Sequence, residues 1–251
     1  MLPTKEWLEK YESVKETLAC SVDLNTYFEL PEIEGKSLTV MNIGPCTVPS
    51  GKLMVFDPLV YIGVQGNAPY YKTVPVGTYD TEVAVIKADG TDCNRYASVR
   101  LRFSENRPVK FYEALVGREN ILEVEEDYFF GFPVDAGLGC ICDAEVYKAF
   151  CEWSEKWNKE HPDGNHYDDY FEPLFAENYK KYPEYQREGG DWLNWQIPGT
   201  EYRVPIFQSG FGDGFYPVYW GVDSSGEICQ IVIQFINIEF EYGEYDEDDE
   251  E

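Results

Sequence analysis

Two runs of alternating residues, joined by a short turn, limit the fold of this chain more than any other feature. In residues 81–86 and again in 99–103, side chains of one kind recur at every second position. Successive side chains of a strand point to opposite faces, so a period of two is typical of a half-buried strand. The "DGTD" at 89–92 supplies the glycine of a tight turn. These residues therefore predict an antiparallel β-hairpin.

Further strands are predicted on both sides of this hairpin. Each is a short run rich in β-branched and aromatic residues, with glycine or proline nearby. They cover residues 38–44, 52–58, 108–116, 202–210, 214–223 and 224–240. We expect the run at 108–116 to extend the hairpin into a meander, and "DSSG" at 223–226 to join the last two strands.

Two helices complete the predicted fold. Residues 4–18 form an amphipathic helix, with Trp7 and Tyr11 at helical spacing. A central helix starts at Ala144, where the carboxylate of Asp143 can cap the first free N–H groups. The fold class is therefore α+β, with mostly antiparallel sheets arranged as a meander and hairpins.

We expect one domain over residues 1–238. Within it, residues 158–195 are aromatic and poorly periodic, which predicts an irregular insertion with a short helix near 173–181. Residues 239–251 hold nine acidic residues and no basic one, so this tail is expected to be disordered.

The net charge of the chain indicates which classes of partner it can bind. There are 47 acidic and 20 basic residues, giving a net charge of -27. Such a surface repels the nucleic-acid backbone and anionic membranes, so we expect neither as a partner. A basic protein or a cation is favoured; the alternative is that the charge serves solubility alone. The oligomeric state is left open.

Cysteine usage and the N-terminus predict a cytoplasmic protein. No secretory signal pattern precedes the first helix. Seven cysteines form an odd, scattered set, unlike a disulfide scaffold. Cys140 and Cys142 would point to one face of a strand, and we expect them to be buried thiols rather than zinc ligands.

Five aspartates beside predicted turns are the candidate chemical groups. A cluster of carboxylates suits Ca²⁺ or Mg²⁺, or can position a water for hydrolysis. Each also has a structural interpretation as a turn residue or helix cap. No metal-binding spacing is recognisable, so no cofactor is predicted and Ca²⁺ or Mg²⁺ stays open. The five are Asp57, Asp135, Asp143, Asp213 and Asp223.

Aromatic residues near the C-terminal strands form a second candidate site. Tyr and Trp offer large contact areas at low entropy cost, which suits an interaction surface. The alternative is that they fill the core. The candidates are Trp192, Trp195, Tyr216, Tyr219 and Trp220.

Four stretches together resemble a known bacterial family. They are "GKLMVFDPLV" (51–60), "VPVGTYDTEVAV" (74–85), "FFGFPVDAGLGCICDAE" (129–145) and "SGFGDGFYPVYWGVDSSGEICQIVIQF" (209–235). The chain resembles the family named domain of unknown function 4241 over about residues 45–238. This resemblance implies a fold and candidate positions, but no reaction.

The function that these features favour is binding without catalysis. A bacterial immunity protein that neutralises a basic toxin is the most specific form, because opposite charge speeds encounter and selects partners. The alternative is a hydrolase that uses the aspartates with a divalent cation.

Overall fold

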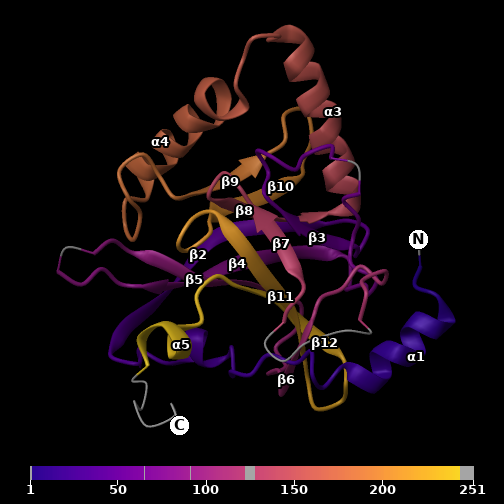
Figure 1. The fold of residues 1–251 in the computed structure, drawn as a ribbon. Helices are drawn as coiled ribbons and strands as arrows, with labels where there is room; N and C mark the ends of the chain where they lie inside the picture. Colours follow the sequence, from indigo (N-terminus) through magenta and orange to yellow (C-terminus); the bar gives the residue numbers. More distant parts are fainter. Residues whose placement is uncertain (1, 65, 91, 122–127, 244–251) are drawn as a thin grey trace.

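The computed structural model describes residues 2–64, 66–90, 92–121 and 128–243, and shows an α+β fold built on two antiparallel sheets (Figure 1). In the large sheet, β7 (Gly131–Val134) and β6 (Lys110–Glu113) pair with different parts of the same strand, β11 (Gly214–Val222). In spatial order its strands are β1 (Glu32–Ile33), β2 (Lys36–Val48), β4 (Gly77–Ile86), β5 (Arg95–Arg102), β12 (Ile228–Gln234), β11 (Gly214–Val222), β6 (Lys110–Glu113), with β7 (Gly131–Val134) off this path.

The small sheet lies between the large sheet and a layer of helices (Figure 1). Cys140 and Cys142 on β8 (Leu138–Asp143) pack toward the helices, whereas Ile141 between them packs toward the large sheet. This confirms the shared face predicted for the two thiols. The strands are, in order, β3 (Leu53–Phe56), β8 (Leu138–Asp143), β10 (Arg203–Gln208) and β9 (Trp192–Gln196), covered by α3 (Ala144–Glu160) and α4 (Glu172–Lys181).

Both predicted hairpins are present. Strands β4 and β5 pair with Val83 opposite Val99, and β11 and β12 pair with Trp220 opposite Ile231. The alternating pattern therefore located the centre of the large sheet.

The predicted meander is wrong in its third strand. Strand β6 falls within 108–116 as expected, but it pairs with β11 and not with β5. The place beside β5 is taken by β12, whose residues after Ile228 are all buried. A strand that is buried on both faces takes a central position in a sheet, and the order of strands along the chain does not show this.

The insertion at 158–195 is more regular than predicted. Helix α3 runs to Glu160, a π-helix covers Tyr167–Phe171, α4 follows directly as Glu172–Lys181, and β9 begins at Trp192. The π-helical turn breaks the 3.6-residue period, which explains why the sequence looks irregular there. The short helix expected near 173–181 is confirmed.

The chain ends also differ from the prediction. Helix α1 spans Lys5–Val14, shorter than 4–18, and a short α2 (Thr26–Glu29) follows. Helix α5 (Ile238–Tyr242) forms where the tail was expected to be disordered, because Asn237 caps it and Ile238 is buried. Residues 244–251 lie outside the described residues. No helix within the described ranges has the length and apolar character needed to cross a bilayer.

Candidate functional site

Asp57 is buried at the end of β3 and serves as an acceptor for the backbone. Its Oδ1 accepts hydrogen bonds from the N–H groups of Leu59 (2.9 Å) and Val60 (3.3 Å). Its Oδ2 accepts from those of Asp135 (3.0 Å) and Ala136 (2.7 Å). Four donors occupy both oxygens, so this carboxylate holds two segments together.

Asp135 and Asp213 meet at the same turn. The Asp213 carboxylate accepts from the backbone N–H of Gly137 at 2.9 Å, and Ser209 N–H donates to the Gly137 carbonyl at 3.1 Å. The Asp135 carboxylate is exposed and accepts from the Tyr61 hydroxyl. The structure thus brings three of the five candidate aspartates to one place, each with a hydrogen bond that supports a loop.

The other two aspartates lie elsewhere. Asp143 caps α3 through Glu145 N–H (2.8 Å), as predicted, and also binds Ser50 N–H (3.0 Å). Asp223 closes the β11–β12 turn, where hydrogen bonds from Ser225 and Asn106 lower its pKa to about 2.

The aspartates therefore do not form one cluster of five. Among the described residues, no group of three His, Cys, Asp or Glu side chains lies close enough together to hold a metal ion. The seven cysteines are free thiols. Burial raises the pKa of Cys140 and Cys142 well above the ordinary value, which makes them poor nucleophiles.

The joined turns form part of the wall of a polar cavity of about 680 Å³. Arg187 lines it and donates to the buried Asp191 (Nε to Oδ1, 2.8 Å) and to the Gln208 side-chain oxygen (3.1 Å). Arg95 lies opposite the ring of Phe211, 4.8 Å from its centroid. Arg187 is thus paired with a carboxylate and Arg95 is stacked on an aromatic ring. These contacts hold both side chains in place in the cavity wall.

The aromatic candidates do not form an exposed surface, and that interpretation is corrected by their burial. Tyr216, Tyr219, Trp220 and Trp192 are buried in the core cluster of the large sheet, while Trp195 is buried in the core under the helices. Both faces of β11 are covered, since Trp220 packs on Tyr70 with ring centroids 5.7 Å apart and Tyr219 lies against Cys20 on the other side. The sequence does not show that the N-terminal segment covers this second face.

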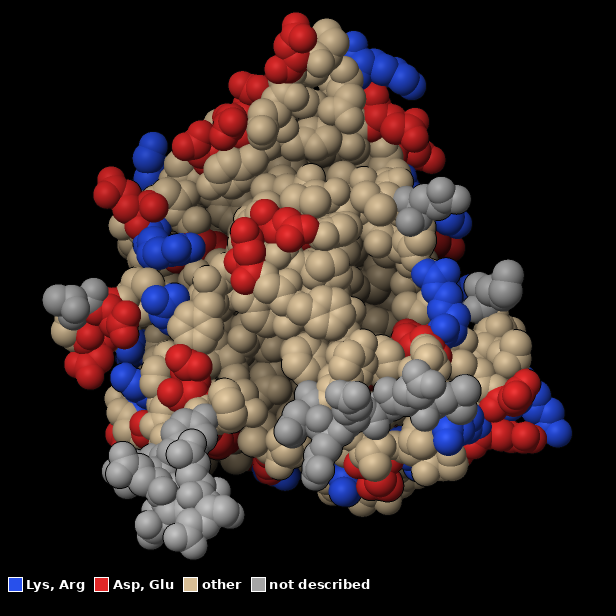
Figure 2. Space-filling model, in the orientation of Figure 1, with Lys and Arg blue, Asp and Glu red and all other residues tan. Residues whose placement is uncertain are grey.

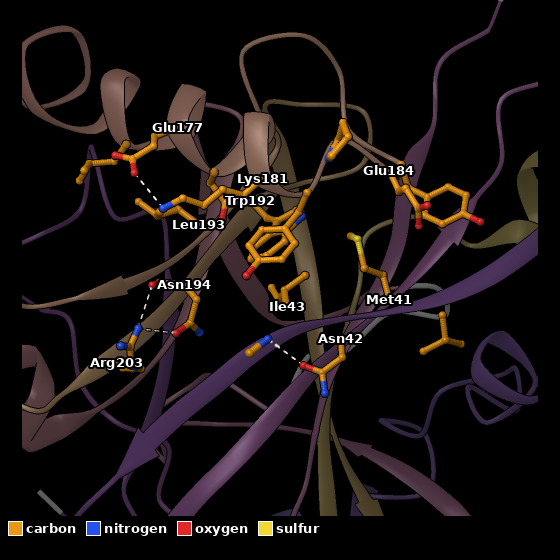
Figure 3. Close-up of a pocket in the computed structure, with 17 residues that line it drawn as sticks. Met41, Asn42, Ile43, Glu177, Lys181, Glu184, Trp192, Leu193, Asn194 and Arg203 are labelled. Carbon is orange, nitrogen blue, oxygen red and sulfur yellow. Dashed lines mark hydrogen bonds and ion pairs between the residues drawn. The ribbon is translucent and has the colours of Figure 1, made fainter.

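Trp192 nevertheless lines a cleft of about 910 Å³ (Figure 3). In Figure 3, Glu177 and Lys181 of α4 lie on one side and Met41 and Asn42 of β2 on the other. Tyr182 packs on Trp192 with ring centroids 5.6 Å apart. A cleft of this size with aromatic walls and a few polar groups is typical of a binding site.

Sequence reasoning missed most of this cleft. Its wall residues Tyr182 and Tyr185 lie in the segment 158–195, for which the sequence predicted only an irregular aromatic insertion. Asn42, Asn194 and Arg203 come from strands whose polar residues gave no motif. They are brought together only by the packing of one sheet on the other.

Comparisons with known proteins agree with the resemblance noted in the sequence. A family model described as "Protein of unknown function (DUF4241)" matches residues 46–233 of the 251. No curated protein and no solved structure matches the chain. The model covers β3 to β12 almost entirely, together with both joined turns. The chain therefore belongs to the DUF4241 family.

Proposed function

We propose that the protein is a binding protein that holds a basic protein partner and carries out no reaction of its own. The observation that supports this most is the excess of 47 acidic over 20 basic residues. In the view of Figure 2, a large area without charged residues lies over β7 and β11, and both acidic and basic residues lie along its margin. A centre with few charges and a charged margin fits the usual anatomy of a protein interface.

Exposed aromatic rings add to this support. Phe215 at the start of β11 is 47 % exposed and stacks on Phe129, with centroids 5.9 Å apart. Phe211 and Tyr128 are also exposed. Large rings in water are the groups that gain most from burial against a partner.

An immunity protein that neutralises a basic toxin in the bacterial cytoplasm is the most specific form of the proposal. Electrostatic attraction raises the rate of encounter with a cationic protein, an advantage where the toxin must be bound before it acts. A toxin encoded beside this chain would support this form, and its absence would count against it.

The alternative, a divalent-cation hydrolase, finds less support. Asp57 and Asp143 are buried and each binds backbone N–H groups. Carboxylates that hold loops together in this way are poorly placed to bind a cation as well. Only Asp135 and Asp213 keep an oxygen for which no hydrogen bond within the described residues is seen.

Capture from a lysate of the native host tests the proposal. The immobilised full chain should enrich a protein of high isoelectric point at low salt, and release it at high salt because exposed charges are screened. The variant Phe215→Ser should capture less, whereas Leu30→Ser, at another exposed apolar residue, should not change capture. Enrichment of no basic protein would overturn the proposal.

A further inference from the structure

The outer edge of β2 is open for hydrogen bonding beside the cleft of Figure 3. Ser37 faces β4, because its carbonyl accepts from Lys87 N–H at 2.9 Å. Leu38 faces the other way, because its N–H donates to Pro31 at 2.7 Å. The N–H and C=O groups of successive residues point toward opposite edges of a strand. The N–H and C=O groups of Val40 and Asn42 therefore point away from β4, as those of Leu38 do.

These outward groups have no partner within the described residues. Strand β1 pairs with β2 only at Lys36 and Ser37 and ends there. No backbone hydrogen bond on this side involves Val40 or Asn42 among the residues that the structure describes. The Val40 side chain is 40 % exposed. An open edge of this kind is a template for another strand.

The edge of β9, across the same cleft, is covered instead. The Trp192 carbonyl accepts from the Asn178 side chain at 2.8 Å, and the Asn194 carbonyl accepts from Arg203 at 3.5 Å. Side chains thus occupy the outer acceptors of β9. The contrast leaves β2 as the edge that can accept a strand in this cleft.

The walls of the cleft suit the side chains of such a strand. Tyr182 is 56 % exposed and stands over Trp192, while Met41 and Ile43 line the side formed by β2. Aromatic and methionine side chains are enriched where proteins bind one another. Glu184 lies at the same cleft and forms no ion pair within the described ranges, so a cationic side chain can pair with it.

We propose that this cleft binds an extended, basic segment of a partner protein by strand addition to β2. Backbone hydrogen bonds to Val40 and Asn42 hold the segment, and an apolar side chain packs on Tyr182. The irregularity between Asn42 and Pro45 ends the open edge, which limits the added strand to a few residues. The basic character of the segment rests on the proposed function; the strand addition rests on the geometry of β2.

A display library of random peptides, selected on the full chain, provides the probe. Selected peptides should carry Lys or Arg and alternate apolar residues. Bound peptide should slow hydrogen exchange of the Val40 and Asn42 amides.

Val40→Pro removes the outward N–H without removing a bond to β4 and should weaken binding about tenfold. Val40→Thr keeps both the N–H and the branched shape, and should bind like the wild type.

The outcomes separate this inference from the proposed function. Equal binding by Val40→Pro, or unchanged exchange at Val40 and Asn42, would overturn strand addition even if basic proteins are captured. Selection of neutral or acidic peptides that protect both amides would support strand addition and overturn the basic partner.

Discussion

The buried carboxylate of Asp57 accepts a hydrogen bond at 3.0 Å from the backbone N–H of Asp135, a residue 78 positions later in the chain. This bond ties the end of β3 to the turn between β7 and β8. The backbone N–H of Gly137, in the same turn, donates a hydrogen bond to the Asp213 carboxylate. Three of the five candidate aspartates, Asp57, Asp135 and Asp213, therefore take part in a structural joint between distant segments.

Replacing Asp57 should destabilise the fold strongly. Asp57→Ala leaves four backbone N–H groups without their acceptor, and buried unsatisfied donors cost about 1–3 kcal/mol each when water does not reach them. We expect a loss of about 3–5 kcal/mol in urea unfolding, since part of the site will relax. Asp135→Ala, at the exposed partner, should cost less than about 1 kcal/mol. Similar losses for the two variants would contradict the structural role of Asp57.

Two aromatic residues of β11 should behave in opposite ways. Trp220 is 0 % exposed, so Trp220→Ala creates a large cavity and should cost about 3–5 kcal/mol in urea unfolding. Phe215→Ala, at an exposed ring, should change stability by less than about 1 kcal/mol. If Trp220→Ala left stability unchanged, the placement of this ring in the core would be wrong.

The parts of the fold that could be predicted are those set by local pattern. Alternation located β4 and β5, the "DSSG" turn joined β11 to β12, and Asp143 marked the start of α3. Each depends on residues close together in the chain. Strand order is different, since the place of β6 beside β11 depends on competition among strands for central positions.

The candidate site could be predicted only in part. The sequence identified Asp135 and Asp213 as two of five candidate carboxylates beside turns, and the structure joins their two turns through the bond from Gly137 N–H to Asp213. The cleft could not be predicted, because Asn42 and Asn194 line it together only when β2 packs on the small sheet, where the Asn194 side chain donates to the Pro45 carbonyl. The burial of Tyr219 depends likewise on Cys20 and the N-terminal segment.

The thiols of β8 should be unreactive in the folded protein. Burial raises the pKa of Cys140 and Cys142, so little thiolate forms at neutral pH and reagents lack access. Iodoacetamide labelling followed by mass spectrometry should modify the half-buried Cys93 faster than either. In urea all three should react at similar rates. Fast labelling of Cys140 in the native protein would contradict its burial.

Glu113 on β6 is a buried carboxyl with few hydrogen-bond donors to stabilise its charged form. It is 3 % exposed, and both its oxygens share one backbone donor, the N–H of Phe130, at 3.1–3.2 Å. Burial, with a smaller contribution from Glu119, raises the pKa of Glu113 from 4.5 to about 8. The folded protein therefore keeps a proton at this site that the unfolded chain loses.

Stability should fall as pH rises from about 4.5 to about 8, because in this window the folded state binds more protons at Glu113 than the unfolded state. Glu113→Gln stays neutral and can still accept from Phe130 N–H, so it should match the wild type near pH 4.5. At pH 8 it should be more stable, with an upper limit of about 5 kcal/mol from about 1.4 kcal/mol per pH unit. Urea unfolding at several pH values measures this difference.

Glu105→Gln, at a surface carboxylate with 97 % of its side chain exposed, serves as the control and should change little at any pH. A Glu113→Gln variant that is no more stable than the wild type at pH 8 would show that the carboxyl is solvated or paired in the folded protein.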